Sequence, residues 1–110
     1  MSGSDLFTGT LDLLILRTLQ GDPLHGYAIG RRIREGSAGI LTVEEGALYP
    51  ALHRLEGRGL LEAEWGKTDT GRRAKFYRVT DEGRSHLELE SERWTAFSGA
   101  VQAILGPKGG

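Results

Sequence analysis

A predicted helix that runs directly into a β-strand, over residues 45–61, most constrains how this chain can fold. Its apolar residues recur at spacings of three and four, which places them on one helical face: Leu48, Ala51, Leu52 and Leu55. The remaining surface carries Tyr49, His53 and Arg54, whose side chains can donate hydrogen bonds to phosphates or base edges. This combination is typical of a helix that contacts DNA.

The elements around this helix follow the order of a winged helix-turn-helix. Apolar periodicity and turn signals predict two preceding helices, a hairpin and a long last helix. Their expected ranges are residue 5 or 10 to residue 20, 24–35, 60–65, 73–79 and 81–105. In this plan the third helix enters the major groove and the hairpin forms the wing. We therefore expect a mainly α fold with a small β-hairpin.

The chain divides by this pattern into a winged-helix DNA-binding domain, residues 1–80, and a C-terminal dimerisation helix with its tail, residues 81–110. Apolar residues of the last helix recur about every half heptad, as in a coiled-coil seam. We expect the first helix to help this contact. The candidate dimer or ligand residues are Leu11, Leu87, Trp94, Phe97, Ser98, Val101 and Ile104.

Short sequence patterns predict where two of the helices begin and which residues of one strand point inward. Thr42 and Glu45 fit a capping box that would open the third helix. Thr80 fits an N-cap for the last helix. Alternation in residues 60–65 predicts a half-buried strand with Trp65 packed inward.

The charge balance is close to neutral but unevenly distributed. The chain carries 14 Lys and Arg against 15 Asp and Glu, a net charge of −1, which is unusual for a DNA-binding protein. The hairpin and its loop, however, hold five cations against Asp69, a local charge of 5 − 1 = +4: Lys67, Arg72, Arg73, Lys75 and Arg78. This cluster favours a wing that contacts phosphates over a hairpin whose charges serve only solubility.

Other function classes have little support. The absence of cysteine excludes disulfides and thiolate metal sites, and His25, His53 and His86 share no ligand spacing. The sequence has no catalytic triad pattern and no phosphate-binding loop. The longest apolar run, residues 13–16, is far short of the roughly 20 residues that span a bilayer. We expect a cytoplasmic protein that is not an enzyme and needs no cofactor or metal.

Four segments together resemble the PadR family of bacterial transcriptional regulators: residues 24–29, 48–56, 59–61 and 71–83. The resemblance implies a homodimeric repressor that binds a palindromic operator in double-stranded DNA. The single last helix is similar to the short-tailed branch of the family. Some members of that branch bind flat aromatic or cationic drugs between paired tryptophans, and Trp94 matches that position.

The expected DNA contacts lie on three elements. Tyr49, His53 and Arg54 are expected in the major groove, and Lys67, Arg72, Arg73 and Lys75 on the wing. Tyr27 and Arg31 are expected on the flanking backbone. Three of the candidate residues also have an interpretation without a binding role: Tyr49 packed under its helix, His53 exposed without a contact, and Trp94 packed in a dimer core. At the level of the whole protein, the alternatives are a protein-interaction module and a drug-sequestering protein.

Overall fold

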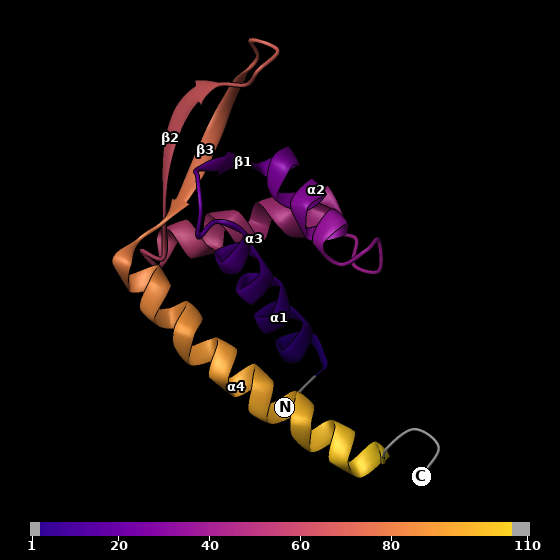
Figure 1. Ribbon diagram of the computed structural model, residues 1–110. Helices are drawn as coiled ribbons and strands as arrows, with labels where there is room; N and C mark the ends of the chain where they lie inside the picture. The colour runs from indigo at the N-terminus through magenta and orange to yellow at the C-terminus, as the bar shows by residue number, and fades with distance from the viewer. Residues whose placement is uncertain (1–2, 107–110) are drawn as a thin grey trace.

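The structure has a helical body and a three-stranded antiparallel sheet, whose two longer strands protrude from that body as a hairpin (Figure 1). The computed structural model describes residues 3–106, with side chains from residue 9 onward. The elements are α1 (Gly3–Thr18), β1 (Leu24–His25), α2 (Gly26–Gly36), α3 (Glu45–Gly57), β2 (Leu61–Lys67), β3 (Arg73–Val79) and α4 (Asp81–Leu105). The mainly helical winged-helix fold that the sequence predicts is confirmed.

The short strand β1 was not predicted, because residues 24 and 25 were expected to open the second helix. Leu24 pairs with Tyr77 and His25 with Phe76, so the sheet order is β1-β3-β2. These pairings hold the two residues in an extended conformation, and α2 begins only afterwards. The Nδ1 atom of His25 accepts a hydrogen bond from the Ala28 N–H at 3.3 Å and thereby caps α2.

The core lies where α1, α2, α3 and the base of the hairpin meet the start of α4. Its fully buried side chains come from these elements: Ile15, Leu16, Leu19, Ile29, Leu52, Leu55 and Leu61. Leu11 and Leu87, which were expected at a dimer interface, also belong to this core, at 7% and 2% exposure. That expectation is wrong for both residues, because a side chain buried within one chain is not available to a second.

The two predicted helix caps have opposite outcomes. The capping box of Thr42 and Glu45 is wrong, because α3 begins later: Glu44 is its N-cap, and no side chain caps it. The Thr80 cap is confirmed. Its hydroxyl accepts a hydrogen bond from the Gly83 N–H at 3.0 Å and donates one to the Gly59 carbonyl at 2.7 Å. Thr80 thus joins the start of α4 to the turn that follows α3.

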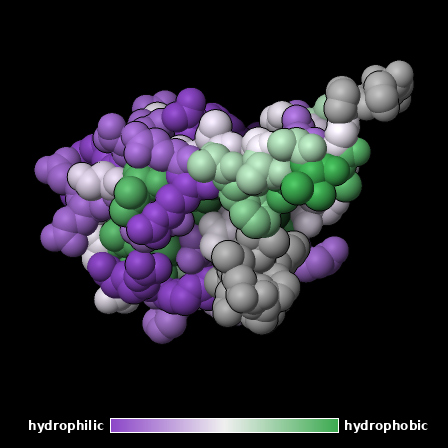
Figure 2. Space-filling model, turned by 90° about the horizontal axis from the view of Figure 1, so that it is seen from below, coloured by the Kyte–Doolittle hydropathy of each residue, from purple (hydrophilic) through white to green (hydrophobic). Residues whose placement is uncertain are grey.

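Helix α4 extends well beyond the core. Its first part packs on α1 and β3, whereas its second part carries exposed apolar side chains: Trp94, Phe97, Val101, Ile104 and Leu105. Figure 2 shows apolar side chains gathered toward the end of the molecule where α4 ends, beside a more hydrophilic half. Within residues 3–106, none of the helices combines the length and the apolar content that a membrane span requires.

Candidate nucleic-acid interface

Helix α3 presents one exposed stripe opposite its buried face. Glu45, Tyr49 and His53 follow one another at spacings of four, and all three are exposed. Residues at this spacing are neighbours on a helix surface. The stripe therefore offers a carboxylate, a phenol and an imidazole to a molecule that lies against α3.

Tyr49 packs on one side of its ring and remains exposed on the other, so its expected contact with DNA stays a prediction. A Cβ at Gly26 would lie 2.7 Å from Cε1 of Tyr49, which shows that the ring rests on the backbone at the start of α2. The side chain is nevertheless exposed enough to make contacts, since Tyr49 is 45% accessible. Gly26 thus sets the position of the Tyr49 ring.

Arg54 does not lie on this stripe. Its guanidinium pairs with the Asp12 carboxylate of α1 at 2.5 Å, with side-chain exposures of 39% and 11%. The sequence placed Arg54 with Tyr49 and His53 because all three lie off the apolar positions. It could not show that α1 packs along this flank of α3 and carries a nearly buried carboxylate that requires a partner.

One side of the hairpin packs on the core at its base and carries basic residues farther out. Strand register places Trp65 opposite Lys75, and Lys67 opposite Arg73, on the same side as the buried Leu61. The prediction that Trp65 packs inward is wrong, since it is 58% exposed. The Arg73 guanidinium instead lies 4.4 Å from the centre of its ring, a cation–π contact. Lys67 follows Trp65 on the same side of β2. A charged residue at that position indicates that this end of the strand does not pack on the core.

Lys75 connects the hairpin to α3. Its ammonium lies 3.1 Å from a carboxylate oxygen of Glu56 on α3. The hydrogen bond to Glu56 raises the pKa of Lys75 above its ordinary value, so the side chain stays charged. This pair is a polar contact between the hairpin and α3.

An open cleft of about 760 Å³ lies between the hairpin and the starts of α2 and α3. It brings together predicted DNA contacts from three elements: Tyr27, Arg31, Tyr49, Arg72, Arg73 and Lys75. His53, Arg54 and Lys67 lie outside its lining. Four cations thus face one concave surface, an arrangement suited to a phosphate backbone.

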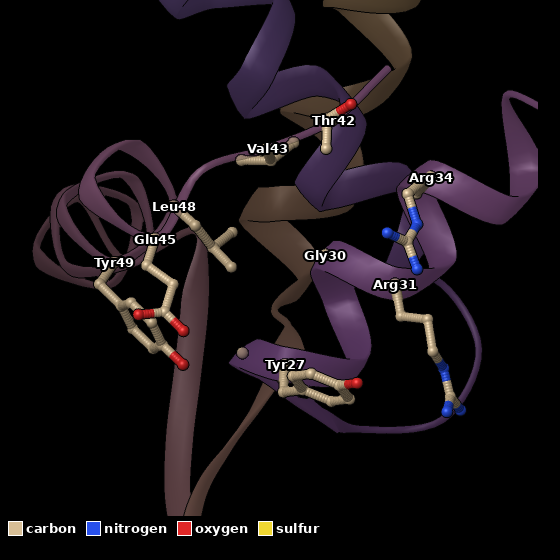
Figure 3. Close-up of a pocket in the computed structure, with 10 residues that line it drawn as sticks. Tyr27, Gly30, Arg31, Arg34, Thr42, Val43, Glu45, Leu48 and Tyr49 are labelled. Carbon is tan, nitrogen blue, oxygen red and sulfur yellow. The ribbon is translucent and has the colours of Figure 1, made fainter. Parts of the chain in front are cut away.

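A smaller hollow of about 210 Å³ adjoins this cleft between α2 and α3. Figure 3 shows Tyr27, Arg31 and Arg34 of α2 on one side, and Glu45 and Tyr49 of α3 on the other. The sequence interpretation did not single out Arg34 or assign Glu45 a role beyond capping. The spacing of four from Glu45 to Tyr49 was the available signal for Glu45.

The exposed candidate dimer and ligand residues, which exclude the buried Leu11 and Leu87, lie together on the second half of α4. Trp94 and Phe97 are exposed neighbours on α4, with ring centres 5.9 Å apart, and Ser98 is half-buried beside them. The second half of α4 and the tip of the hairpin lie at opposite ends of the molecule (Figure 1). Within the described residues, no group of three His, Asp or Glu side chains could hold a metal ion.

Comparison with known proteins gives consistent matches. The model of the transcriptional regulator PadR-like family matches residues 15–89, which include α3, the hairpin and every residue lining the cleft. A protein named as a transcriptional regulator in Mycobacterium tuberculosis is 51% identical over 95 residues, which cover 86% of this chain and 81% of that protein.

Solved structures share the whole architecture. A transcriptional regulator from Clostridium thermocellum has a TM-score of 0.83 at 28% identity, covering 96% of this chain and 100% of its own. A PadR family transcription regulator from Clostridium difficile has a TM-score of 0.75 at 30% identity, covering 87% and 98%. The likeness therefore includes the long last helix as well as the winged-helix part.

Proposed function

Since the chain belongs to the transcriptional regulator PadR-like family, we propose that it is a homodimeric repressor that binds a palindromic operator in the cytoplasm. The observation that carries this proposal is the cleft where α2, α3 and the hairpin converge with four cations. Phosphate contacts by such a surface supply affinity, and side chains of α3 supply contacts to base edges.

Each predicted contact has a place in this proposal. Tyr49 and His53 enter the major groove on the exposed stripe of α3. The wing residues Lys67, Arg72 and Arg73 contact phosphates, and Tyr27 and Arg31 contact the flanking backbone. Lys75 contacts phosphate and also joins the hairpin to α3 through Glu56, whereas Arg54 holds α3 against α1 through Asp12.

A second copy of the chain would cover the exposed apolar side chains of α4. Trp94, Phe97 and Val101 are each about two-fifths exposed, and Ile104 is almost fully exposed. Rings and aliphatic side chains on one exposed helix are characteristic of a coiled-coil-like interface. Residues 1–80 then bind DNA and residues 81–110 hold the dimer, with the two α3 helices one helical turn of DNA apart, roughly 34–36 Å.

The same interface supports a ligand that relieves repression. Trp94 and Phe97 offer aromatic faces, and Ser98 adds a small polar side chain. A flat aromatic or cationic molecule stacked there would change the angle between subunits, and hence the spacing of the two α3 helices.

Hydroxyl-radical footprinting on the DNA upstream of the gene for this chain tests the proposal. We expect two protected half-sites with their centres about one helical turn apart. A single protected block contradicts the dimer. An unprotected duplex contradicts operator binding and favours an interaction module, or a drug-sequestering protein if planar cations still quench Trp94 fluorescence.

A further inference from the structure

The cleft with its four cations also contains two carboxylates, Asp69 in the loop of the hairpin and Glu45 at the start of α3. Glu45 lines both the cleft and the adjoining hollow, together with Tyr27, Arg31 and Tyr49. It is the first residue of α3, and it is exposed. A negative charge at this place repels a phosphate backbone. Unlike Asp69, Glu45 lies on α3, the helix proposed for the major groove, where a carboxylate can meet base edges.

The Glu45 carboxylate is free to accept hydrogen bonds. Throughout the described residues, no ion pair or side-chain hydrogen bond engages it, whereas Glu56 and Asp12 are both paired with cations. Figure 3 shows its carboxylate beside the Tyr49 ring, on the α3 side of the hollow. Its position is four residues before Tyr49, on the stripe that faces the proposed groove.

The donors and acceptors that each base presents in the major groove limit which base such a carboxylate can recognise. Guanine presents only acceptors, N7 and O6, which repel a carboxylate. Adenine sets its N7 acceptor beside its N6 amino group, a pattern that suits an amide. Cytosine presents an N4 amino donor on its major-groove edge, and this is the group from which a carboxylate accepts a hydrogen bond.

We propose that Glu45 determines sequence specificity by accepting a hydrogen bond from the N4 amino group of one cytosine in each operator half-site. This inference rests on the proposed function. The Glu45 carboxylate also disfavours other sequences. A duplex without that cytosine offers it no hydrogen-bond donor, which weakens binding to that duplex.

A structural role for Glu45 is the competing explanation, because an acidic residue in the first turn stabilises a helix through its dipole. Glu44 provides the matched control. It is the adjacent residue, is also an exposed glutamate at the start of α3, and makes no side-chain cap hydrogen bond. Unlike Glu45, it lines neither the cleft nor the hollow.

The test is selection of bound duplexes from a randomised DNA library with the wild-type protein, Glu45→Gln and Glu44→Gln. We expect the wild type to enrich a palindrome with one strongly preferred cytosine per half-site. In Glu45→Gln that preference falls about tenfold and moves toward adenine, which an amide can pair with. Glu44→Gln keeps the wild-type preference. Melting of all three proteins, followed by circular dichroism, shows that the variants are folded.

An unchanged motif and preference in Glu45→Gln overturns the inference, and so does an equal loss in Glu44→Gln. If Glu45→Gln does not fold, Glu45→Asp replaces it: the shorter carboxylate is expected to weaken the same cytosine preference, and an intact preference overturns the inference. A wild-type protein that enriches no motif overturns the proposed function itself. A motif that does not depend on Glu45 overturns only this inference.

Discussion

Arg54 in α3 forms an ion pair with Asp12 in α1, a residue 42 positions earlier in the chain. Asp12 is nearly buried, and α1 packs against both α3 and α4. The pair therefore connects the helix proposed for the major groove to the helix that packs against the proposed dimer helix.

Asp12→Asn is expected to lower the free energy of unfolding by about 1–3 kcal/mol, because it leaves the Arg54 charge without its partner. Urea denaturation measures this change, and a double-mutant cycle with Arg54→Gln isolates the pair. Arg78→Gln is the control: its partner is Glu62, both side chains are more than half exposed, and the expected loss is below about 0.5 kcal/mol. Equal losses at the two pairs would show that burial of Asp12 is irrelevant.

Two glycines of α4 are expected to respond oppositely to alanine. A Cβ at Gly83 would lie 2.2 Å from the Leu60 carbonyl oxygen, whereas one at Gly99 meets nothing within 4 Å. Gly83→Ala is therefore expected to destabilise the protein by about 3 kcal/mol or more. Gly99→Ala is expected to stabilise it by about 0.5–1 kcal/mol. Thermal melting compares them, and a tolerated Gly83→Ala would mean that α4 does not start this close to the hairpin.

Removing the charges of the wing is expected to weaken binding to every sequence. Arg72→Ala with Arg73→Ala deletes two cations of the cleft, and each phosphate contact contributes about 0.9 to the slope of log affinity against log salt. We expect the slope to flatten by about two, measured by fluorescence anisotropy. Arg78→Ala, on the opposite face of β3, is the control. An unaltered slope in the double variant contradicts a wing contact.

A charge on the exposed face of α4 is expected to separate the dimer. Phe97→Glu places a carboxylate where the proposed interface needs an apolar ring, so sedimentation should report a monomer with reduced operator affinity. Gln102→Glu, also exposed on α4 but already polar in the wild type, should leave the mass unchanged. A Phe97→Glu protein that sediments like the wild type would place the dimer contact elsewhere.

The stability of the protein is expected to fall at alkaline pH. Burial raises the pKa of Tyr77 above its usual 10.0, and the Glu56 hydrogen bond raises that of Lys75 above 10.5. A group whose pKa is higher in the folded than in the unfolded protein contributes fully to the stability of the fold below its unfolded-state pKa. It loses this contribution as the pH rises through its folded-state pKa. Urea unfolding below and above about pH 10 should show the loss. Tyr77→Phe should reduce it, and Tyr27→Phe, at an exposed tyrosine, should not.

Local patterns predicted the elements that depend on local residues. Spacings of three and four located α3, alternation located β2 and β3, and the Thr80 hydroxyl marked the start of α4. Each of these signals lies within a few residues of the structure that it predicts, so no knowledge of the rest of the fold was needed.

Pairings between distant segments could not be predicted in this way. Strand β1 exists because β3, some fifty residues later, supplies its hydrogen bonds. An apolar stripe does not show what covers it, so Leu11 and Leu87 were assigned to a partner although their own chain buries them. The roles of Arg54 and Trp65 likewise depend on side chains of other elements, Asp12 and Arg73.

The most direct test of the central claim is binding to the duplex upstream of the gene for this chain, against a scrambled duplex of the same composition, across a salt series. We expect an operator affinity at least about a thousandfold tighter than that for the scrambled duplex, with both falling steeply as salt rises. Equal affinity for the two duplexes at every salt concentration, or binding to neither, would contradict the account.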